Sequence, residues 1–505
     1  MISAGIDLGT TFSAIAHINP EGIPTLFPDA HDADLFRTPS VVHIGEMDCL
    51  VGDNVENLLE DQPETPVARH TKLLLGSRRP IYIDQLGRDW TAEAINALIL
   101  SKLRHDLQTF AYDGLGDAVI TVPAQFGDTQ RRAVRRAAEL VDINVSSLVD
   151  EPVAAATYLS THHSAEQTLL VYDLGGGTFD ATVLRCSPDE ISVLATDGDS
   201  RTGGKWIDEL IMQLMSDELE RLHGTNFCQS PATQLQLRQL AGETKLKLCK
   251  PGRTQVRHNT LIGNQPFDFV MTGHHFNTLI EPMLEENIDV AERCLRSANV
   301  GWSDVDQILL VGGSTLIPAV REQLARRAGR PATEIQSRQP HKAVAFGAAI
   351  LAGAATPQHR QRIPALRQAI AGYDLGVRIR DPGTGKLAIY KLIKRNAALP
   401  TQATKVFKTS RDDQTRMIIE VVQSKGDATN ALSLGNFSFG PIANPKANYP
   451  IEVTMQYDSE GIASVHARDA ETGQEMTQTL SHDADLPTSD NDQERSLVAS
   501  VAINA

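Results

Sequence analysis

Residues 169–180 read Leu-Leu-Val-Tyr-Asp-Leu-Gly-Gly-Gly-Thr-Phe-Asp, an apolar strand followed by an aspartate and a glycine-rich turn. A similar phrase stands at residues 4–12, Ala-Gly-Ile-Asp-Leu-Gly-Thr-Thr-Phe, and a third strand-to-glycine turn occupies residues 308–315, Ile-Leu-Leu-Val-Gly-Gly-Ser-Thr. Any one of them could be an ordinary β-turn, because Asp and Gly are the commonest turn residues. Two Asp-x-Gly turns in successive segments predict a duplicated α/β unit, with phosphates bound between the two turns by backbone N–H groups.

Strands and helices alternate between these turns. Residues 117–123 read as a buried strand stopped by Pro123. Asp128 reads as the N-cap of a helix whose apolar positions recur at helical spacing as far as Val141. Such alternation is typical of α/β domains.

The pattern changes after about residue 356, where Pro357 and Pro364 flank a polar stretch that reads as a linker. Turn signals then separate short strands, expected at Leu387–Ile393, Lys405–Lys408, Arg416–Val422, Ile451–Tyr457 and Ile462–Arg468. The predicted divisions are an α/β domain (1–356), a linker (357–372), an all-β domain (373–480) and a polar tail (481–505). Within the tail, Leu497–Val501 could form a short helical turn.

The composition excludes several classes of protein. The 47 Lys and Arg against 63 Asp and Glu give a formal charge of −16, and an acidic surface repels nucleic acid and anionic lipid. No apolar run approaches the ~20 residues that span a bilayer, and no signal peptide is visible. The five cysteines contain no Cys-x-x-Cys pair, which argues against a disulfide framework or a zinc cluster. We therefore expect a cytoplasmic protein that binds neither nucleic acid nor membrane.

Taken together, these segments resemble the 70-kDa heat-shock chaperone family from about Met1 to Leu480. The motifs that carry the resemblance are residues 5–11, 118–124, 150–152, 173–180 and 310–315, with residues 392–396 and 399–401 in the all-β domain. The resemblance implies an α/β actin-like, two-lobed ATPase domain, a linker and a β-sandwich. It also implies that the chain hydrolyses ATP to ADP with Mg²⁺ and binds unfolded or extended apolar polypeptides.

The resemblance assigns roles to individual residues. Asp7 and Asp173 would hold hydrated Mg²⁺, a hard cation that prefers carboxylate and water oxygens. Lys72 would neutralise charge on the transferring phosphoryl group, while Glu151 and Thr178 would orient the attacking water. The other nucleotide-binding residues it implies are Gly9, Thr10, Thr11, Phe12, Gly175, Gly176, Gly177, Gly203, Gly204, Lys245, Cys249, Gly312, Gly313, Ser314 and Leu316.

Plainer interpretations stand beside these roles. Lys72 could be a solvated surface lysine, Glu151 could merely close a strand before Pro152, and Thr178 could be a turn hydroxyl. Pro123 and Arg131 match the family's relay between nucleotide and linker, but could equally be a strand stop and a helix surface charge. The basic patch on the same helix, Arg131, Arg132, Arg135 and Arg136, is interpreted as a solvated face.

The adenine pocket departs from the family pattern. Gly242 and Leu246 stand where the family has Glu and Arg on one helix, and Leu316 stands where it has an Arg after Gly-Gly-Ser-Thr. Loss of both arginine planes removes stacking and cation–π attraction to the base, so we expect weaker or less selective ATP binding.

Other departures concern coupling and partners. Arg367 and Gln368 interrupt the family's run of linker leucines, which predicts weaker or differently built interdomain coupling. Ser147 and Ala369 replace an Arg and an Asp that the family offers to J-domain cochaperones, so only a dedicated cochaperone is expected. The family's long helical lid has no counterpart, which predicts fast peptide dissociation.

Three residues of the all-β domain match peptide-lining positions of the family: Phe407, Met417 and Ile419. Methionine suits a promiscuous apolar site, although each of the three could equally be ordinary sandwich core.

Two functions remain. The first is an ATP-hydrolysing chaperone that binds extended apolar segments, supported by the presence of Asp7, Lys72, Glu151, Asp173 and Thr178 together. The second is a nucleotide-stabilised scaffold or adaptor for one dedicated protein, with a weak or uncoupled ATPase, supported by the departures. A sugar or acetate kinase would share the Asp-x-Gly turns, but the appended all-β domain argues against it.

Overall fold

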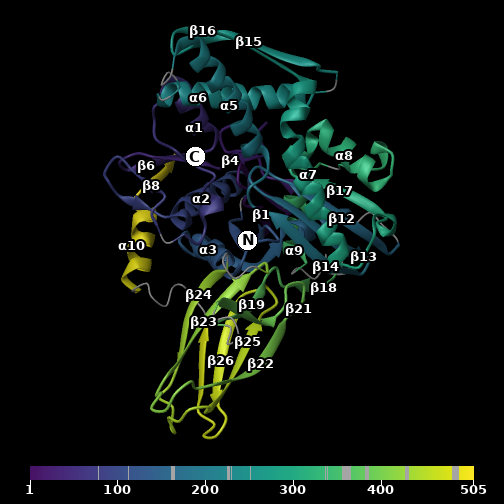
Figure 1. The fold of residues 1–505 in the computed structure, drawn as a ribbon. Coiled ribbons are helices and arrows are strands. Elements are labelled where there is room, and N and C mark those ends of the chain that lie inside the picture. Colours follow the sequence, from purple (N-terminus) through teal and green to yellow (C-terminus); the bar gives the residue numbers. More distant parts are fainter. Residues whose placement is uncertain are drawn as a thin grey trace.

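Apolar strands and helices of the first 354 residues form two lobes around two sheets in the computed structural model (Figure 1). The structure describes residues 1–504 except 78, 112, 161–164, 225–227, 229, 251, 336, 338, 355–364, 381–385, 427–430 and 480–487. Within these residues no helix is both long enough and apolar enough to cross a membrane.

The sheet of lobe I has the strand order β11-β10-β1-β2-β3, and β4 pairs with β2. Its strands are β1 (Ile2–Asp7), β2 (Phe12–Ile18), β3 (Pro24–Leu26), β4 (Thr38–Pro39), β10 (Leu115–Val122) and β11 (Asn144–Asp150). β1 lies between antiparallel β2 and parallel β10. Parallel pairing brings the end of β1 at Asp7 beside Thr121, so the first Asp-x-Gly turn opens at the sheet edge.

The sheet of lobe II repeats this arrangement. Its order is β17-β12-β13-β14-β18-β21, and β12 lies between antiparallel β13 and parallel β17. The strands are β12 (Gln167–Leu174), β13 (Phe179–Cys186), β14 (Glu190–Asp199), β17 (Gln307–Val311), β18 (Ala365–Ile370) and β21 (Ala398–Leu399). β1 and β12, which carry Asp7 and Asp173, thus occupy equivalent positions, as the repeated phrase predicts.

Two helices, α4 (Glu151–Ser160) and α9 (Ala343–Gly353), join the lobes by unusually close contact. A Cβ on Gly347 would lie 1.7 Å from the Ala154 carbonyl oxygen, and a Cβ on Gly5 would lie 2.1 Å from the Ala349 nitrogen. Only glycine fits at such approaches, so these two positions hold the two lobes at a fixed spacing.

Outer elements complete each lobe. Lobe I has α1 (Asp53–Asp61), α2 (Ala92–Phe110), α3 (Asp128–Glu139) and the short strands β5 (Val41–Ile44), β6 (Asp48–Val51), β7 (Ala68–Arg69), β8 (Tyr82–Ile83) and β9 (Asp89–Trp90). Lobe II has α5 (Gly204–His223), α6 (Pro231–Leu248), α7 (Gly273–Ser297), α8 (Pro318–Ala328) and the hairpin of β15 (Gln255–Ile262) and β16 (Gln265–Thr272). Short 3₁₀ helices η1 (Thr71–Leu74) and η4 (Gly313–Leu316) border the cleft side of each lobe.

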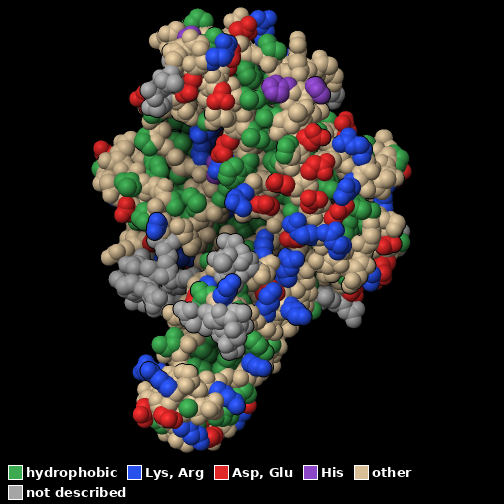
Figure 2. Space-filling view, viewed as in Figure 1, with side chains coloured by type: hydrophobic (Ala, Val, Ile, Leu, Met, Phe, Trp, Pro, Cys, Tyr) green, Lys and Arg blue, Asp and Glu red, His purple; other side chains and the backbone are tan. Residues whose placement is uncertain are grey.

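Two four-stranded sheets form a β-sandwich below the lobes, visible as the narrow lower part of the molecule in Figures 1 and 2. One sheet has the order β20-β19-β23-β24 and the other β22-β25-β26-β27. The strands are β19 (Asp374–Arg380), β20 (Leu387–Ile393), β22 (Thr401–Lys408), β23 (Met417–Ser424), β24 (Leu432–Phe439), β25 (Pro450–Tyr457), β26 (Ala463–Asp469) and β27 (Glu475–Thr479). The five expected strands correspond to β20, β22, β23, β25 and β26, whereas β19, β24 and β27 were not predicted.

The N-cap prediction for α3 is off by one residue. Gly127 is the N-cap and Asp128 is the first helical residue. The Asp128 carboxylate accepts a hydrogen bond from the Ala463 N–H of the β-sandwich at 2.7 Å, so a tertiary contact takes the side chain that was expected to cap the helix.

Part of the expected linker is a sheet strand. β18 pairs in parallel with β14 and antiparallel with β21, so residues 365–370 extend the sheet of lobe II. A ladder uses backbone groups, and the polar residues Arg367 and Gln368 therefore do not prevent the linker from docking. The side chains of residues 365–368 lie outside the described part of the structure.

Residues 488–504, which the sequence predicted as part of a polar tail, form a helix and a strand. Residues Thr488–Ala499 form helix α10 and residues Ala502–Asn504 form strand β28, which pairs in parallel with β6 of lobe I. The physical reason is the spacing of Leu497, Val498 and Val501, which join the hydrophobic core of lobe I although their neighbours are polar.

Candidate functional site

The two Asp-x-Gly turns face each other across the cleft between the lobes. A Cβ on Gly176 would lie 1.9 Å from Thr11 Oγ1, and a Cβ on Gly177 would lie 3.0 Å from Thr10 Cγ2. The β12–β13 turn therefore needs glycine because the threonines of the β1–β2 turn fill the space that a side chain would take. The two turns therefore meet in the cleft, at the place where the sequence predicts that phosphates bind.

The remaining glycine segments of lobe II gather at the same turn. The Gly175 carbonyl accepts from Ser314 Oγ at 2.8 Å and from the Gly204 N–H at 3.0 Å. Gly203 has a φ of 127° and fits against the Gly175 and Gly177 backbone, so a side chain there would be both strained and crowded. Lys245 of α6 reaches the Gly204 carbonyl at 3.0 Å.

Lys72 is a buried residue at the centre of the cleft, which rules out the surface-lysine interpretation. Its Nζ lies 2.5 Å from Glu151 Oε1, and the side chain is 3% exposed. The short η1 helix carries Lys72 on lobe I, while Glu151 begins α4. Asn96 of α2 donates to Thr71 Oγ1 at 3.1 Å and so fixes the turn that presents the lysine.

Four carboxyl groups, those of Asp7, Glu151, Asp173 and Asp180, lie around this ammonium group, and the charges of Arg37 and Lys425 also act on Asp7 and Asp180. Burial and the nearby Glu151 raise the pKa of Asp7 to about 7, against the opposing effect of Lys72. Burial and the neighbouring Glu151, Asp180 and Asp7 raise the pKa of Asp173 well above its usual range. Burial and Glu151 also raise the pKa of Asp180 to about 8. The cluster is short of positive charge, which is the electrostatic setting of a cation or phosphate–metal site.

The donors present fit a hydrated magnesium ion. Among the described residues, no group of three or more His, Cys, Asp and Glu side chains is placed to bind a metal directly. Mg²⁺ keeps several waters and takes one or two carboxylates, so Asp7 and Asp173 would suffice to hold it. The buried Asp180 Oδ1 has no hydrogen-bond partner in the structure, which leaves an acceptor for a metal-bound water.

The base end of the cleft is different in character. Leu316 is 48% exposed and Leu246 is 65% exposed, and a Cβ on Gly242 would meet nothing within 4 Å. Cys249 is the C-cap of α6 and is half-buried. Of the residues that replace the family's Glu and Arg pair, Leu246 is therefore open to solvent and Gly242 is half-buried.

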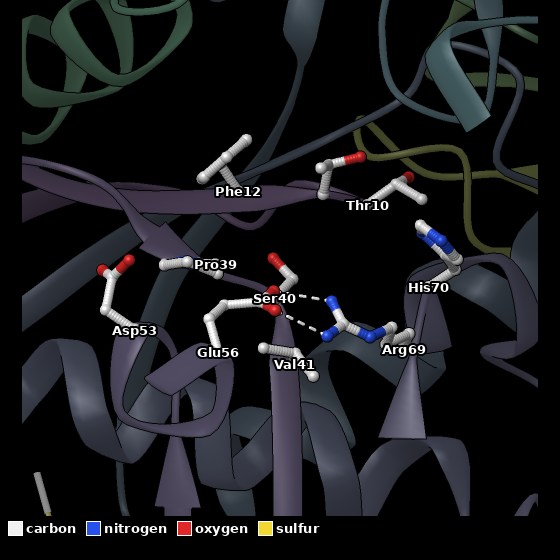
Figure 3. Close-up of a pocket in the computed structure, with 10 residues that line it drawn as sticks. Thr10, Phe12, Pro39, Ser40, Val41, Asp53, Glu56, Arg69 and His70 are labelled. Carbon is white, nitrogen blue, oxygen red and sulfur yellow. Dashed lines mark hydrogen bonds and ion pairs between the residues drawn. The ribbon is translucent and has the colours of Figure 1, made fainter. Parts of the chain in front are cut away.

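A separate cavity of about 180 Å³ lies beside the β1–β2 turn of lobe I (Figure 3). Its lining residues are Thr10, Thr11, Phe12, Pro39, Ser40, Val41, Asp53, Glu56, Arg69 and His70. Arg69 donates to both oxygens of Glu56, at 2.6 and 2.7 Å, and Arg37 lies over the Phe12 ring at 4.6 Å. The cavity is smaller than the ~300–1,000 Å³ of typical ligand pockets, so it cannot by itself hold a nucleotide.

Sequence reasoning missed several residues of the site. Asp180 was quoted within the motif but given no role, although it stands opposite Asp173 in the β12–β13 hairpin. Thr121 donates to Asp7 at 3.4 Å, and Asp208 pairs with Lys245 at 2.7 Å. The strand pattern around Thr121 marked burial only, and nothing in the sequence linked Asp208 to Lys245.

The basic helix α3 is a contact surface and not a solvated face. Arg131 is buried and pairs with Asp150 at 2.6 Å, directly before Glu151. Arg132 pairs with Asp128 at 3.0 Å, and Arg135 pairs with Glu460 of the β-sandwich at 2.5 Å. The interpretation of the patch as solvated was wrong, because Arg131 is buried and because Arg135 and Arg136 pair with Glu460 and Glu494, which lie more than 300 residues away in the sequence.

The structure places Met417 and Ile419 in the core between the two sheets of the β-sandwich. Phe407 is only partly buried, and its ring lies edge-on to Tyr390 with the centroids 6.1 Å apart. Exposed apolar side chains on these two strands are Leu387 and Tyr390 of β20 and Val406 of β22. The sequence had not singled out these three residues.

Comparison with protein families agrees with this arrangement. The family model described as Hsp70 protein matches residues 3–502 of the 505-residue chain. Such a protein has a two-lobed actin-like ATPase domain followed by a β-sandwich, and the mixed α/β structure is consistent with it. Members of the family generally bind ATP or ADP with Mg²⁺, unfolded polypeptides and J-domain cochaperones. The chain belongs to the Hsp70 protein family.

Proposed function

We propose that this chain is an ATP-dependent chaperone that hydrolyses Mg·ATP and binds extended apolar polypeptide segments. The observation that carries the proposal is the buried Lys72–Glu151 pair, 2.5 Å apart, between two glycine turns that each follow a buried aspartate. A lysine and a carboxylate kept this far from water, with neighbouring carboxyl groups of raised pKa, are typical of catalytic sites.

Hydrolysis at this site depends on positioning and electrostatics. Backbone N–H groups of the two turns and the hydroxyls of Thr10 and Thr11 bind the phosphates in the gap between the lobes. Lys72 stabilises charge on the transferring phosphoryl group, and Glu151 orients the attacking water with help from Thr178. Asp7 and Asp173 would hold Mg²⁺, which supplies charge neutralisation between the phosphate oxygens.

Contacts between the β-sandwich and the ATPase domain support coupling of the two activities. Tyr373 donates its hydroxyl proton to the Gln125 carbonyl at 2.8 Å, and Gln423 accepts from the Asp128 N–H at 3.1 Å. Lys425 donates to the Gly198 carbonyl at 3.1 Å, and Gly198 pairs with Asp180 in the sheet register. A β-sandwich that moves on binding peptide would therefore disturb residues one step from the carboxylate cluster.

The surface around Tyr390 and Phe407 is where we expect peptide to bind. β20 and β22 are edge strands of the two sheets, Tyr390 of β20 contacts Phe407 of β22, and each strand also carries an exposed apolar side chain, Leu387 and Val406. An extended apolar segment could add backbone hydrogen bonds at an edge and bury its side chains on this patch.

Single-turnover hydrolysis of Mg·ATP, with and without excess extended leucine-rich peptide, tests the proposal. We expect hydrolysis in the absence of peptide and a several-fold faster rate in its presence. Hydrolysis at an unchanged slow rate would show an uncoupled ATPase and would favour the second candidate.

That second candidate is a nucleotide-stabilised adaptor for one dedicated protein. The exposed Leu246 and Leu316 favour it, because a base held without arginine stacking would serve stability more than rapid turnover. Capture of several unrelated unfolded proteins by the purified chain would argue against an adaptor, whereas selective capture of a single partner would support it.

A further inference from the structure

The C-terminal residues return to lobe I after the last strand of the β-sandwich. Figure 1 shows α10 and β28 in yellow beside α3 and β6, at the far end of the chain from the N-terminus but on the same lobe. We call residues 488–504 the C-terminal clasp. It lies on the side of the molecule away from β18, the strand by which the β-sandwich is attached to lobe II.

Charged contacts hold the helix of the clasp. The Glu494 carboxylate pairs with Arg136 of α3, whose Nε lies 2.9 Å away, and accepts a hydrogen bond from Thr91 Oγ1. Thr91 is the N-cap of α2, so the Glu494 charge lies at a helix N-terminus, where an anion is stabilised. Arg495 pairs with Asp142 at 2.7 Å and donates to the Glu139 carbonyl at 2.7 Å.

Apolar burial and strand pairing hold the rest. Val498 and Val501 are 5% and 7% exposed within the hydrophobic core of lobe I. β28 pairs with β6 from Ala502 to Asn504, and the Ala502 N–H donates to the Met47 carbonyl at 2.9 Å. β6 would otherwise be an edge strand of its small sheet, with unpaired backbone groups facing solvent.

The β-sandwich is therefore attached to the ATPase domain at both of its ends. At its start, β18 is paired within the sheet of lobe II. At its end, only the eight residues 480–487 separate Thr479 of β27 from Thr488 of α10. A fully extended connection of this length spans roughly 30 Å, at ~3.3–3.6 Å per residue.

We propose that the C-terminal clasp restrains the β-sandwich by holding its far end on lobe I. Loss of the direct interdomain contacts then frees the β-sandwich only within the reach of residues 480–487. The two domains stay within that range of each other in every nucleotide state. The inference does not depend on hydrolysis of ATP, because it rests only on the attachment of the clasp.

Hydrogen exchange of the full chain gives the first test. Amides of residues 494–504 should exchange at least tenfold more slowly than those of an unstructured peptide of the same sequence. Exchange at the unstructured rate would overturn the proposal, because the clasp would then be a free tail.

Small-angle X-ray scattering gives the second test. In this experiment and the next, every protein compared, the reference included, carries Tyr373→Phe and Glu460→Ala, which remove direct contacts between the β-sandwich and the ATPase domain. Glu494→Arg places like charge against Arg136, and Ala502→Pro removes the donor to Met47, so the double variant should release the clasp and increase the largest dimension of the molecule. Asp492→Arg makes the same charge change at an exposed position of α10 and should leave the dimension unchanged. An unchanged dimension after release, with release verified by hydrogen exchange, would overturn the proposal.

A longer connection between β27 and α10 tests whether the clasp restrains the β-sandwich or only packs on lobe I. Insertion of twenty Gly and Ser residues after Pro487 leaves every clasp residue in place, so folding of lobe I should be unaffected. The proposal expects this variant to widen the molecule as the released clasp does. If the clasp remains protected from exchange and the dimension does not change, the clasp covers the sheet of lobe I without restraining the β-sandwich, and the proposal fails.

Discussion

The two ends of the nucleotide cleft differ sharply. At the phosphate end, Lys72 is 3% exposed, and Gly176 of one turn lies so close to Thr11 of the other that no side chain would fit between them. Three aspartates at this end have raised pKa values. At the expected base end, Leu246 and Leu316, which stand where the family has arginine, are exposed. In the function that we propose, phosphate recognition depends on backbone geometry and buried charge, whereas base recognition depends on a few side chains that can change without disturbing the fold.

The largest effect that we expect is on ATP hydrolysis, from a substitution of Lys72 at the phosphate end. Lys72→Ala should slow single-turnover hydrolysis by 100-fold or more, because one buried charge aimed at the transition state commonly contributes a factor of ~10²–10³. Nucleotide should remain bound. Lys408→Ala, at an exposed lysine of β22, is the matched control and should hydrolyse ATP as the parent does. Hydrolysis by Lys72→Ala at the parent rate would show that the phosphate end is not the catalytic centre.

The second prediction concerns the close contact between the two glycine turns. Gly176→Ala would put a methyl group 1.9 Å from Thr11 Oγ1, so the turns must separate and nucleotide affinity should fall about tenfold. Gly114→Ala adds the same methyl group where nothing lies within 4 Å and should change nothing. Isothermal titration with ADP and Mg²⁺ measures both variants. Equal affinities would mean that phosphates are not held between the turns.

At the base end, a substitution should strengthen nucleotide binding instead of weakening it. Leu316→Arg restores a cationic plane beside the cleft and should tighten ATP binding several-fold through stacking and cation–π attraction. Leu222→Arg, at an exposed position roughly 27 Å along α5 from its cleft end, makes the same charge change and should have no such effect. Competition between ATP and GTP should also shift toward ATP only in the first variant. A similar gain in ATP affinity in both variants would show that the added positive charge, and not stacking on the base, strengthens binding.

The smallest expected effect is a pH dependence of stability. Because the folded-state pKa values of Asp7 and Asp180, about 7 and about 8, lie above the ordinary value of 3.8, the fold favours the protonated groups. Their stabilising contribution is fully present below the ordinary pKa of 3.8 and is lost progressively as the pH rises from there to the folded-state pKa values of about 7 and about 8. Without nucleotide, the melting temperature should therefore fall by a few degrees between pH 6 and pH 9.

Asp180→Asn removes one of these titrations, so the fall should become shallower in that variant. Scanning calorimetry at matched ionic strength measures the difference. Parallel curves for the parent and the Asn variant would show that the pH dependence arises elsewhere on the acidic surface.

Much of the phosphate end could be predicted from sequence because its chemistry lies in contiguous phrases. Residues 4–12, 169–180 and 308–315 each contain a strand, a turn and the residues that face the cleft. Strand periodicity and glycine then place Asp7 and Asp173 at equivalent edges of two sheets. Lys72 stands alone in the sequence, and only family resemblance pointed to it.

Contacts between distant segments could not be predicted. Asp128 was expected to cap its own helix, but the Ala463 N–H of the β-sandwich takes its carboxylate. The arginines of α3 looked like a solvated face because Glu460 and Glu494 stand more than 300 residues away. Charge pairing over such separations leaves no local signal.

The sequence by itself determined the duplicated α/β plan, the change to an all-β domain near residue 373 and the glycine turns that follow Asp7 and Asp173. These follow from local periodicity and from the backbone freedom of glycine, which neighbouring residues reveal. Only the tertiary structure decided that residues 365–370 join lobe II, that Met417 and Ile419 are core, and that residues 488–504 belong to lobe I. Each of these depends on a sheet edge or an apolar surface supplied by another part of the chain, and burial of that surface outweighs the polar character of the segment that covers it.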